Sequence, residues 1–396
     1  MSKLEELLNK LCSDGVEFIK LDKCLSYEQP TKYIVKCKDY IETGLPVLTA
    51  GQTFILGYTD ETEGVFNASK DNPVIIFDDF TTSFHWVDFD FKIKSSAMKM
   101  LRPRADMNIS FRFVYYAMKC IKYQTLEHSR QWISKYSQLE IPLPPIEVQN
   151  EIVRILDCFT QLEAELEAEL DCRKRQYEFY RDQLLSFDKL TPPERNNVVW
   201  MPITEVFEMR NGYTPSKNKP EYWEGGKIPW FRMEDIRKNG RILSDSIQHI
   251  TMDGVKKGNL FKANSFILAT TATIGEHALV IADSLANQRF TNLSVRKSLK
   301  DRIIIKFLFH YMFIIDDWCK NNVNISGFAS VDMNKFKKLE IPIPPIEEQS
   351  RIVAILDRFE SLTTSLQHGL PAEIAARRQQ YEYYRDKLLD FKRKTA

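Results

Sequence analysis

Two adjacent aspartates and an acid–x–lysine triplet are the residues whose spacing comes closest to that of a catalytic site. Asp78 precedes Asp79 directly, and Asp90 is followed two positions later by Lys92. Metal-dependent nucleases use carboxylates to hold an ion that activates water. One acid pair with one acid–x–lysine triplet is common by chance, however, so the pattern gives only slight support for a self-contained nuclease.

Other catalytic signatures are incomplete. Gly225-Gly226-Lys227 is followed by isoleucine, which breaks the phosphate-loop pattern. Asn72-Pro73-Val74 lacks the second proline and the aromatic residue with which amino-methyltransferases hold a flipped base. The six histidines form no HxxxH pair and the seven cysteines no CxxC pair. The sequence therefore contains no catalytic constellation and predicts neither a catalytic residue nor a metal site.

Composition indicates a protein of two or three domains. The 396 residues are 43% hydrophobic and 28% charged, and no apolar run approaches the roughly 18 residues of a membrane span. Scattered cysteines and a charged N-terminus favour the reducing cytoplasm, with no membrane partner. The net charge is +1, but residues 147–171 alone carry −7, which leaves +8 elsewhere. A basic remainder is compatible with nucleic-acid binding.

One long stretch occurs twice in the chain. LEIPLPPIEVQNEIVRILDCF at 139–159 returns as LEIPIPPIEEQSRIVAILDRF at 339–359, an offset of 200. RQYEFYRDQLLSF at 175–187 returns as QQYEYYRDKLLDF at 379–391, an offset of 204. This period is too long for a solenoid. It predicts two copies of one domain, each followed by a long helical module.

The first helical module is expected to be a rod with a helical partner. Residues 146–187 contain no proline or glycine, and 42 residues of helix span roughly 63 Å. Charged residues cover most of the surface, while apolar ones recur every three or four positions as a seam: Ile152, Ile155, Phe159, Leu162, Leu166, Tyr177, Tyr180, Leu184 and Phe187. The second module should break at His368–Pro371. The tandem LEAELEAEL at 162–170 favours helix and could gain or lose a unit without leaving it.

The segments before each module combine strand and helix signals. A short helix is expected at 1–14, strands at 73–80, 84–93 and 265–270, and aromatic-rich helices at 111–123 and 303–319. The order of signals is the same in both segments. The tryptophans at 132, 223 and 230 are expected to serve mainly as core residues.

These repeats resemble the central and C-terminal helical regions of type I restriction-modification specificity subunits. The start of the second globular segment also looks like a target-recognition domain of that family, through Gly212-Tyr213-Thr214-Pro215-Ser216, Glu221-Tyr222-Trp223 and Ile228-Pro229-Trp230. The LEAE tandem is similar to the variable spacer repeat of some members. The resemblance covers nearly the whole chain.

The resemblance implies an α/β (α+β) fold of two similar mixed target-recognition domains, separated by two helical regions that pack as an antiparallel coiled coil with pseudo-two-fold symmetry. The expected boundaries are 1–138 for domain 1, 139–190 for the central helical region, 191–338 for domain 2 and 339–396 for the C-terminal helical region.

The resemblance further implies a subunit without catalysis or cofactor that reads a bipartite, asymmetric site in double-stranded DNA. Its partners would be two methyltransferase subunits and the restriction/translocase subunits, which would carry S-adenosylmethionine, ATP and Mg. The alternative is a coiled-coil scaffold with two protein-binding heads.

Base and phosphate contacts require polar side chains on loops. In domain 1 the candidates are Gln29, Thr31, Lys32, Tyr33, Gln52, Thr53, Thr81, Thr82 and Arg130. In domain 2 they are Tyr213, Thr214, Ser216, Lys217, Arg232, Thr270, Thr271, Thr273, Gln288, Arg289 and Asn292. Any one of them could instead be an ordinary turn or cap residue.

Overall fold

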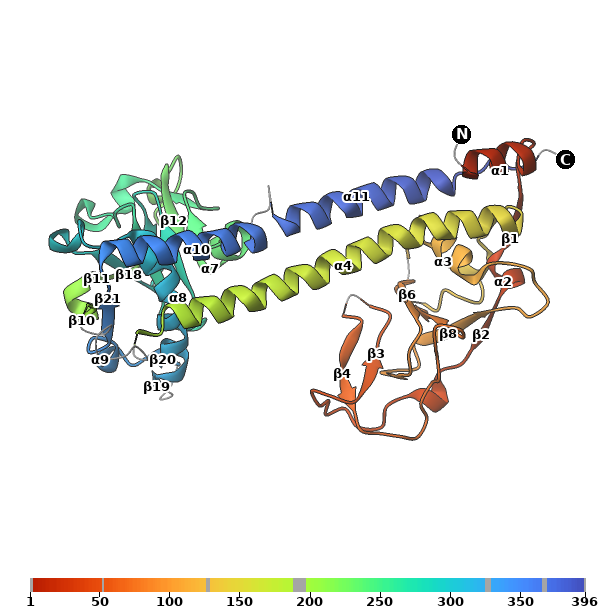
Figure 1. Cartoon of the computed structure of the whole chain (residues 1–396), viewed down its shortest axis with the longest axis horizontal. Helices are drawn as coiled ribbons and strands as arrows, with labels where there is room; N and C mark the ends of the chain where they lie inside the picture. Colours follow the sequence, from red (N-terminus) through yellow and green to blue (C-terminus); the bar gives the residue numbers. More distant parts are fainter. Residues whose placement is uncertain are drawn as a thin grey trace. The chain divides into compact units, whose positions relative to one another are not determined.

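The computed structural model describes residues 3–51, 53–125, 129–187, 197–324, 329–364 and 369–394. Contacts divide the chain into two compact units, which we call unit 1 (Met1–Glu167 with Glu373–Ala396) and unit 2 (Ala168–Ala372). Each unit contains one mixed domain, one half of helix α4 (Ile146–Leu184) and one helix from the C-terminal region (Figure 1). No helix among the described residues is long and apolar enough to cross a membrane.

Unit 1 is built on an antiparallel four-stranded sheet of order β2-β8-β5-β6 (Leu25–Glu28, Met98–Pro103, Val74–Asp78, Phe84–Val87). One face of this sheet packs with α3 (Phe111–Lys119), which shares a core cluster with Ile75 and Phe77. A second sheet of order β4-β3-β7 (Ile55–Thr59, Leu45–Leu48, Lys92–Ile93) has one antiparallel and one parallel pair. The remaining short elements are α1 (Lys3–Leu11), α2 (Leu21–Cys24), η1 (Thr31–Tyr33) and η2 (Tyr136–Gln138).

Unit 2 repeats this plan with one more strand. Its main sheet has the order β11-β18-β15-β16-β13 (Phe207–Asn211, Phe290–Val295, Ser265–Ala269, His277–Val280, Ile242–Leu243), and α8 (Ile305–Asn321) replaces α3. The three-stranded sheet β14-β12-β17 (His249–Ile250, Ile228–Phe231, Leu285–Ala286) again has one antiparallel and one parallel pair. Other elements are α6 (Ile203–Val206), α7 (Met233–Asn239), α9 (Met333–Phe336), β19 (Val323–Asn324), β20 (Ser330–Val331), η4 (Pro220–Tyr222), η5 (Met252–Gly254), η6 (Lys256–Gly258) and η7 (Lys297–Leu299).

The repeated proline-rich segment is a strand that closes each mixed domain. β9 (Glu140–Leu143) pairs antiparallel with β1 (Glu17–Lys20), and β21 (Glu340–Ile343) pairs with β10 (Val199–Pro202). These are isolated two-stranded ribbons, where a proline that lacks an N–H is tolerated at an unpaired edge. The ribbon therefore brings the start and end of each domain together just before the long helix begins.

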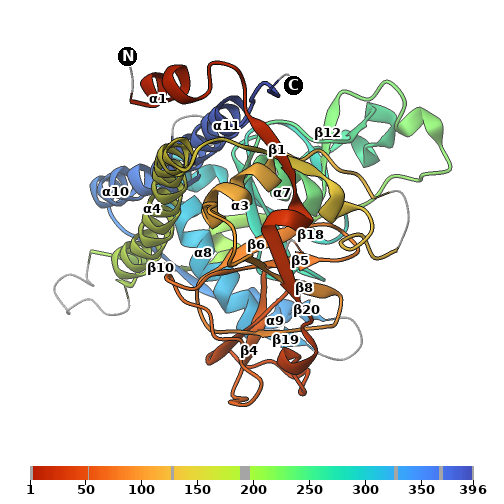
Figure 2. The same cartoon turned by 90° about the vertical axis from the view of Figure 1, so that its right-hand side faces the viewer.

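A glutamine from the same repeat ties each long helix to its domain. The buried Gln149 amide accepts a hydrogen bond from the Ser110 N–H (2.9 Å) at the start of α3 and donates to the Pro144 carbonyl (2.7 Å). Gln349 accepts from the Ile304 N–H (2.8 Å) at the start of α8 and donates to the Pro344 carbonyl (2.9 Å). This side chain explains why both copies end their proline-rich motif in glutamine. Figures 1 and 2 both show α3 against α4.

Each unit also pairs its half of α4 with an antiparallel helix. In unit 1, Phe159 stacks on Tyr384 of α11 (Leu370–Leu388) with ring centroids 5.5 Å apart. Farther along α4, Glu163 and Glu167 both contact Arg378, so the two helices run in opposite directions. In unit 2, Tyr180 stacks on Phe359 of α10 (Ile346–Thr364) at 5.3 Å. The two stacks join equivalent positions of the repeats and confirm the expected helix pairing.

The fold class expected from the sequence is confirmed, with local corrections. The stretch 84–93 is not one strand, because β6 and β7 belong to different sheets and the Asp90 carboxylate between them accepts the Ala68 N–H. The helix expected at 111–123 ends at Lys119. α10 ends at Thr364 and α11 begins at Leu370, consistent with the expected break, although His368 lies outside the described residues.

Part of the expected interhelical seam belongs to the domain cores. Ile152 is fully buried in the core cluster of unit 1, and Tyr177 packs against the core of unit 2. Trp132 and Trp230 are buried core residues as expected, and Trp223 packs edge-on against Trp230.

Candidate nucleic-acid interface

Three loops of unit 2 converge at one end of its main sheet. The loop after β11 is joined to the β17–β18 loop, because the Gly212 N–H donates to the Phe290 carbonyl (2.8 Å) and the Tyr213 N–H to the Ala286 carbonyl (2.9 Å). The β15–β16 loop joins them, since the Thr270 N–H donates to the Arg289 carbonyl (2.9 Å). We call these loops A (212–217), B (287–289) and C (270–276).

Most of the domain 2 candidates lie on these loops. Ser216, Lys217, Gln288 and Arg289 are exposed, while Tyr213, Thr214, Thr271 and Thr273 are half-buried. The Thr214 hydroxyl donates to the Gln288 side-chain oxygen at 2.6 Å, which links loops A and B through side chains. Hydroxyl, amide and guanidinium groups of this kind are the ones that contact phosphates and base edges.

Unit 1 joins its loops through equivalent hydrogen bonds. The Asp79 N–H donates to the Ala97 carbonyl (2.8 Å), as Thr270 does to Arg289 in unit 2. The Lys94 N–H donates to the Leu48 carbonyl at the end of β3 (3.2 Å), as Asn287 does to Phe231 at the end of β12. Loops B and C of unit 1 are therefore 94–97 and 79–83. Loop A of unit 1 is 29–33, which follows β2 as loop A of unit 2 follows β11.

Sequence reasoning missed loop B of unit 1. Lys94 and Ser96 are exposed and Ser95 is half-buried, and this Lys-Ser-Ser segment occupies the place of loop B in unit 2. No local motif marks it, because the two B loops share neither residue types nor the offset of the helical repeats. Only the matching backbone hydrogen bonds reveal the correspondence.

The other domain 1 candidates are divided between surface and internal roles. Thr31, Thr53, Thr81 and Arg130 are exposed, Thr82 is half-buried with a left-handed backbone (φ +60°), and Gln52 lies outside the described residues. Arg130 directly precedes Gln131, whose N–H donates to the Asp79 carbonyl at 2.7 Å, so Arg130 lies beside loop C.

Some loop A side chains of unit 1 are already engaged. Gln29 accepts a hydrogen bond from the Lys99 ammonium at 3.0 Å, and the Tyr33 hydroxyl donates to Glu28 at 2.9 Å. Lys32 pairs with the same Glu28 carboxylate at 2.7 Å, and this hydrogen bond raises the pKa of Lys32. Lys32 would have to exchange this carboxylate for a phosphate in order to contact DNA.

The structure removes two candidates and sets one apart. Asn292 is fully buried and donates to the Ser265 hydroxyl (2.9 Å) and the Phe266 carbonyl (3.0 Å), so its amide belongs to the sheet. Thr270 is also buried, with its hydroxyl near Thr291 at 3.3 Å. Arg232 is the N-cap residue of α7 and lies over the Trp230 ring, outside loops A to C.

The acidic residues whose spacing resembled that of a nuclease metal site have structural partners. The buried Asp79 carboxylate accepts the Trp132 N–H at 2.8 Å and pairs with the buried Lys99 at 3.4 Å. Lys92 is buried against Glu61 at 2.8 Å, and this hydrogen bond lowers the pKa of Glu61 to about 2. These groups hold loops together, and the geometry does not support the nuclease hypothesis.

One further cluster of potential metal ligands is already paired with a lysine. His310, Asp357 and Glu360 have ligand atoms within 4.8 Å of one another. The Lys306 ammonium lies 3.6 Å from Asp357 and 3.3 Å from Glu360. This amine supplies the positive charge that a metal ion would otherwise bring, so the group is better described as an ion-pair cluster at the contact of α8 and α10.

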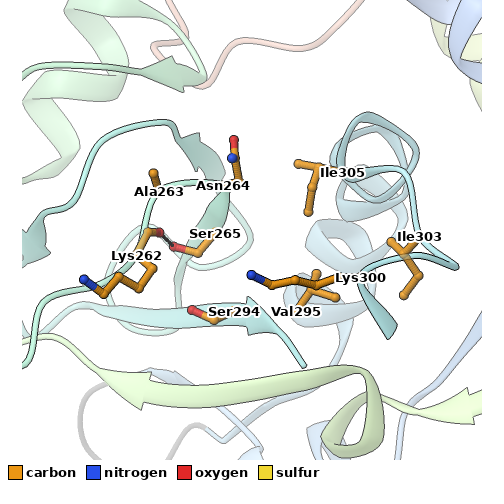
Figure 3. A pocket seen from close by; sticks show the side chains of 9 residues that line it. All are labelled: Lys262, Ala263, Asn264, Ser265, Ser294, Val295, Lys300, Ile303 and Ile305. Carbon is orange, nitrogen blue, oxygen red and sulfur yellow. Dashed lines mark hydrogen bonds between the residues drawn. The ribbon is translucent and has the colours of Figure 1, made fainter. Parts of the chain in front are cut away.

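One cavity in unit 2 lies away from loops A to C. It has a volume of about 220 Å³ and lies at the start of β15, whereas loop C follows the end of that strand. Figure 3 shows Lys300 and Ile305 lining it opposite Ser265, whose hydroxyl donates to the Lys262 carbonyl. The cavity is therefore not part of the candidate interface.

Comparisons with known proteins identify the family. The model of the type I restriction modification DNA specificity domain matches twice, at residues 21–171 and 196–376. The EcoR124I/EcoR124II specificity subunit of Escherichia coli is 45% identical over 99% of this chain and 97% of its own length. A putative type I specificity subunit of Haemophilus influenzae is 29% identical over 98% of both chains.

Solved structures agree on the fold. The specificity subunit from M. genitalium has a TM-score of 0.53 at 15% identity and covers 95% of this chain and 96% of its own. A chain from a study of type I restriction-modification complex assembly has a TM-score of 0.56 at 17% identity, covering 95% and 97%. With two matches of the family model and a full-length relative at 45% identity, the chain belongs to the specificity subunits of type I restriction-modification systems, which provide DNA sequence recognition.

Proposed function

We propose that loops A, B and C of each unit contact one half of a bipartite, asymmetric site in double-stranded DNA. The observation that supports this most strongly is the equivalence of loops B and C, which the same backbone hydrogen bonds join in both units, while loop A follows the matching strand, β2 or β11, in each. The side chains of loop B differ, with Lys94-Ser95-Ser96-Ala97 in one unit where the other has Asn287-Gln288-Arg289. Two similar scaffolds with different side chains would read two different half-sites.

The proposed contact residues are the exposed and half-buried candidates on the loops and beside them. In unit 1 they are Gln29, Thr31, Lys32, Tyr33, Thr81, Thr82 and Arg130, to which we add Lys94, Ser95 and Ser96. In unit 2 they are Tyr213, Thr214, Ser216, Lys217, Thr271, Thr273, Gln288 and Arg289. Thr53, Gln52 and Arg232 stay candidates outside the loops.

The division of the chain into two recognition domains and two helical regions, with boundaries after residues 138, 190 and 338, also stays a proposal.

We further propose that the subunit acts in a complex. Methyltransferase and restriction/translocase subunits would bind it in the cytoplasm and carry S-adenosylmethionine, ATP and Mg, while this chain carries out no catalytic step. The relative named as a subunit of a restriction enzyme supports this assembly. The scaffold alternative would leave the paired loops and the family match without a role.

The test is methylation mapping in a host strain that lacks other type I systems. The chain is co-expressed with its methyltransferase subunit, and modified bases are mapped by single-molecule sequencing. We expect one bipartite motif. The double variant Gln288→Ala with Arg289→Ala should relax one half of the motif only, and Lys94→Ala with Ser96→Ala the other half only, since each base contact contributes ~1–3 kcal/mol of discrimination.

Lys300→Ala is the matched control, because Lys300 is exposed and lies at the cavity rather than on the loops. It should leave both halves unchanged. Relaxation of both halves by either loop variant, or of neither, would refute the assignment of one unit to one half-site.

The spacing between the halves is proposed to follow the length of the α4 segment that contains the tandem repeat. Deletion of one LEAE unit removes four residues, or about 6 Å of helix. The mapped motif should then keep both halves with a shorter gap. An unchanged gap would show that this helix does not determine the spacing.

A further inference from the structure

One inner strand of the main sheet in unit 1 has a buried donor that reaches both neighbouring strands. Lys99 of β8 is fully buried, and its ammonium donates to the Gln29 side-chain oxygen at 3.0 Å and lies 3.4 Å from the Asp79 carboxylate. Gln29 directly follows β2 and Asp79 directly follows β5, the strands on either side of β8. The Lys99 side chain therefore joins the first residue of loop A to the first residue of loop C.

A threonine makes the same connection in unit 2. The Thr291 hydroxyl donates to the Asn211 side-chain oxygen at 3.1 Å and lies 3.3 Å from the Thr270 hydroxyl. Thr291 is buried on β18, between β11 and β15. Asn211 is the last residue of β11, directly before loop A, and Thr270 is the first residue of loop C. The connection is thus present in both units, charged in unit 1 and neutral in unit 2.

The strand register shows that these residues are equivalent. Thr291 pairs with Asn211 across β18 and β11, and the register of β2 and β8 places Gln29 opposite Lys99, one residue beyond their last pair. The loop C residue lies two positions beyond the other strand partner of the central residue in both units. Asn211 is therefore the counterpart of Gln29, although no sequence motif singles it out.

The buried donors fix the direction of the two amides. A lysine ammonium has only hydrogen-bond donors, so the Gln29 oxygen faces Lys99 and the amide nitrogen is turned away from it. The Thr291 hydroxyl likewise holds the Asn211 oxygen. Gln29 and Asn211 are both exposed, and neither amide nitrogen has a hydrogen-bond partner among the described residues. Each amide therefore presents two N–H donors at the surface.

Both amides lie at the candidate interface. Asn211 is followed by Gly212, which packs so closely on loop B that a Cβ there would collide with the carbonyl oxygens of Ala286 and Asn287. An amide whose oxygen is already engaged can still donate to acceptor atoms on base edges, such as N7 of a purine, O6 of guanine or O4 of thymine.

We propose that Gln29 and Asn211 are equivalent specificity-determining residues, each of which donates from its amide nitrogen to a base-edge acceptor in one half-site. Lys99 and Thr291 are the positioning residues that hold these amides in one orientation. This inference rests on the proposed function, since it requires the loops of each unit to contact DNA.

Exchange of each amide for the matching acid separates recognition from folding. Gln29→Glu and Asn211→Asp keep the oxygen that accepts from the buried donor but remove both N–H donors, so the thermal unfolding transitions should stay at their wild-type temperatures. Methylation mapping of the complex with the methyltransferase subunit should show a ~5-fold to ~150-fold loss of discrimination at one position, in a different half of the motif for each variant. A purely structural role of the amides would leave the motif unchanged.

Asn239→Asp is the matched control, because Asn239 is an exposed amide at the last position of α7, outside loops A to C. It adds the same charge to unit 2 and should leave the motif intact.

The positioning role has its own pair of variants. Thr291→Val removes the hydroxyl that holds Asn211 and keeps the branched shape that a strand favours. It should relax the same motif position as Asn211→Asp, and Thr291→Ser, which keeps the hydroxyl, should retain the wild-type motif. Equal relaxation by valine and serine would show that Thr291 acts through packing and would refute its positioning role.

The inference is overturned if the acid variants leave the motif intact, or if they weaken methylation of all sites equally, as loss of a phosphate contact would. Relaxation of one half by Gln288→Ala with Arg289→Ala would then still support the proposed function. A wild-type complex that methylates no bipartite motif would instead refute the proposed function itself.

Discussion

Replacement of Gln349 by leucine should destabilise unit 2 by about 3 kcal/mol. The side chain is fully buried and makes three hydrogen bonds, with the Ile304 N–H (2.8 Å), the Arg302 carbonyl (2.8 Å) and the Pro344 carbonyl (2.9 Å). Leucine has a similar helix propensity, so the helix itself is little affected. The bond to the Pro344 carbonyl is buried and the other two are partly buried, and a desolvated backbone group left without its partner costs ~1 kcal/mol or more.

The corresponding change in unit 1 should be smaller. Gln149 makes two such bonds, with the Ser110 N–H and the Pro144 carbonyl, so Gln149→Leu should cost about 2 kcal/mol. For units of this size, 1 kcal/mol corresponds to about 2–4 °C in Tm. The expected losses are therefore about 6–12 °C for the transition of unit 2 and about 4–8 °C for that of unit 1.

Calorimetry gives the two transitions, and amide hydrogen exchange assigns each to a unit. Gln349→Leu should increase exchange at the start of α8 and leave α3 protected. Gln161→Leu is the control, because Gln161 is exposed and bonds only to Glu165 of its own helix. If Gln349→Leu lowers the free energy of unfolding by less than ~0.5 kcal/mol, which is the range of a typical surface substitution, the role assigned to the repeated glutamine is refuted.

Three further predictions use simpler measurements. Glu61→Gln should cost about 3 kcal/mol at pH 7, because it leaves the buried Lys92 ammonium without a charged partner and with only the Glu63 carbonyl. The pKa of Glu61 is lowered to about 2, so the difference from wild type in urea unfolding should shrink as pH falls from about 4.5 to 2. Arg378→Met removes the contacts with both repeat glutamates. Because the side chains of Arg378 and Glu167 are more than half exposed, the loss should stay below ~1 kcal/mol and vanish in 1 M salt. Burial raises the pKa of Cys24 and Cys319 to about 12, so these thiols should react with a disulfide reagent only after unfolding, well after the exposed Cys37, Cys158 and Cys172.

The helical regions could be predicted closely because their signals are local. The absence of proline and glycine from residues 146–187 fixes a helix, and α4 ends only three residues before the expected limit. The pairing of that helix could not be predicted as closely, because an apolar residue in the sequence does not indicate which surface will cover it. Ile152 and Phe159 both looked like seam residues, yet only Phe159 stacks on the opposing helix while Ile152 enters the domain core.

The mixed domains were harder to predict, because their strands pair with segments that are far away in the sequence. The alternation at 84–93 correctly indicated strand, but which sheet each half joins depends on pairing with residues 74–77 and 47–48. The Asp90 side chain accepts the Ala68 N–H and holds the turn between them. No feature within ten residues of the sequence encodes that partner.

The candidate interface shows the same limit more sharply. The expectation of polar side chains on loops suggested Gln288 and Arg289 but also Asn292. Residue type cannot distinguish an exposed amide from one that the sheet needs internally. Lys94 was not selected from the sequence, because it lies in a short loop that has no recognisable motif. The duplication itself supplied the missing information, since a backbone hydrogen bond at the end of β3 has its counterpart at the end of β12. The side chains of loop B differ between the units while the scaffold keeps the backbone contacts, so comparison of the two halves locates candidate contact residues that neither half reveals alone.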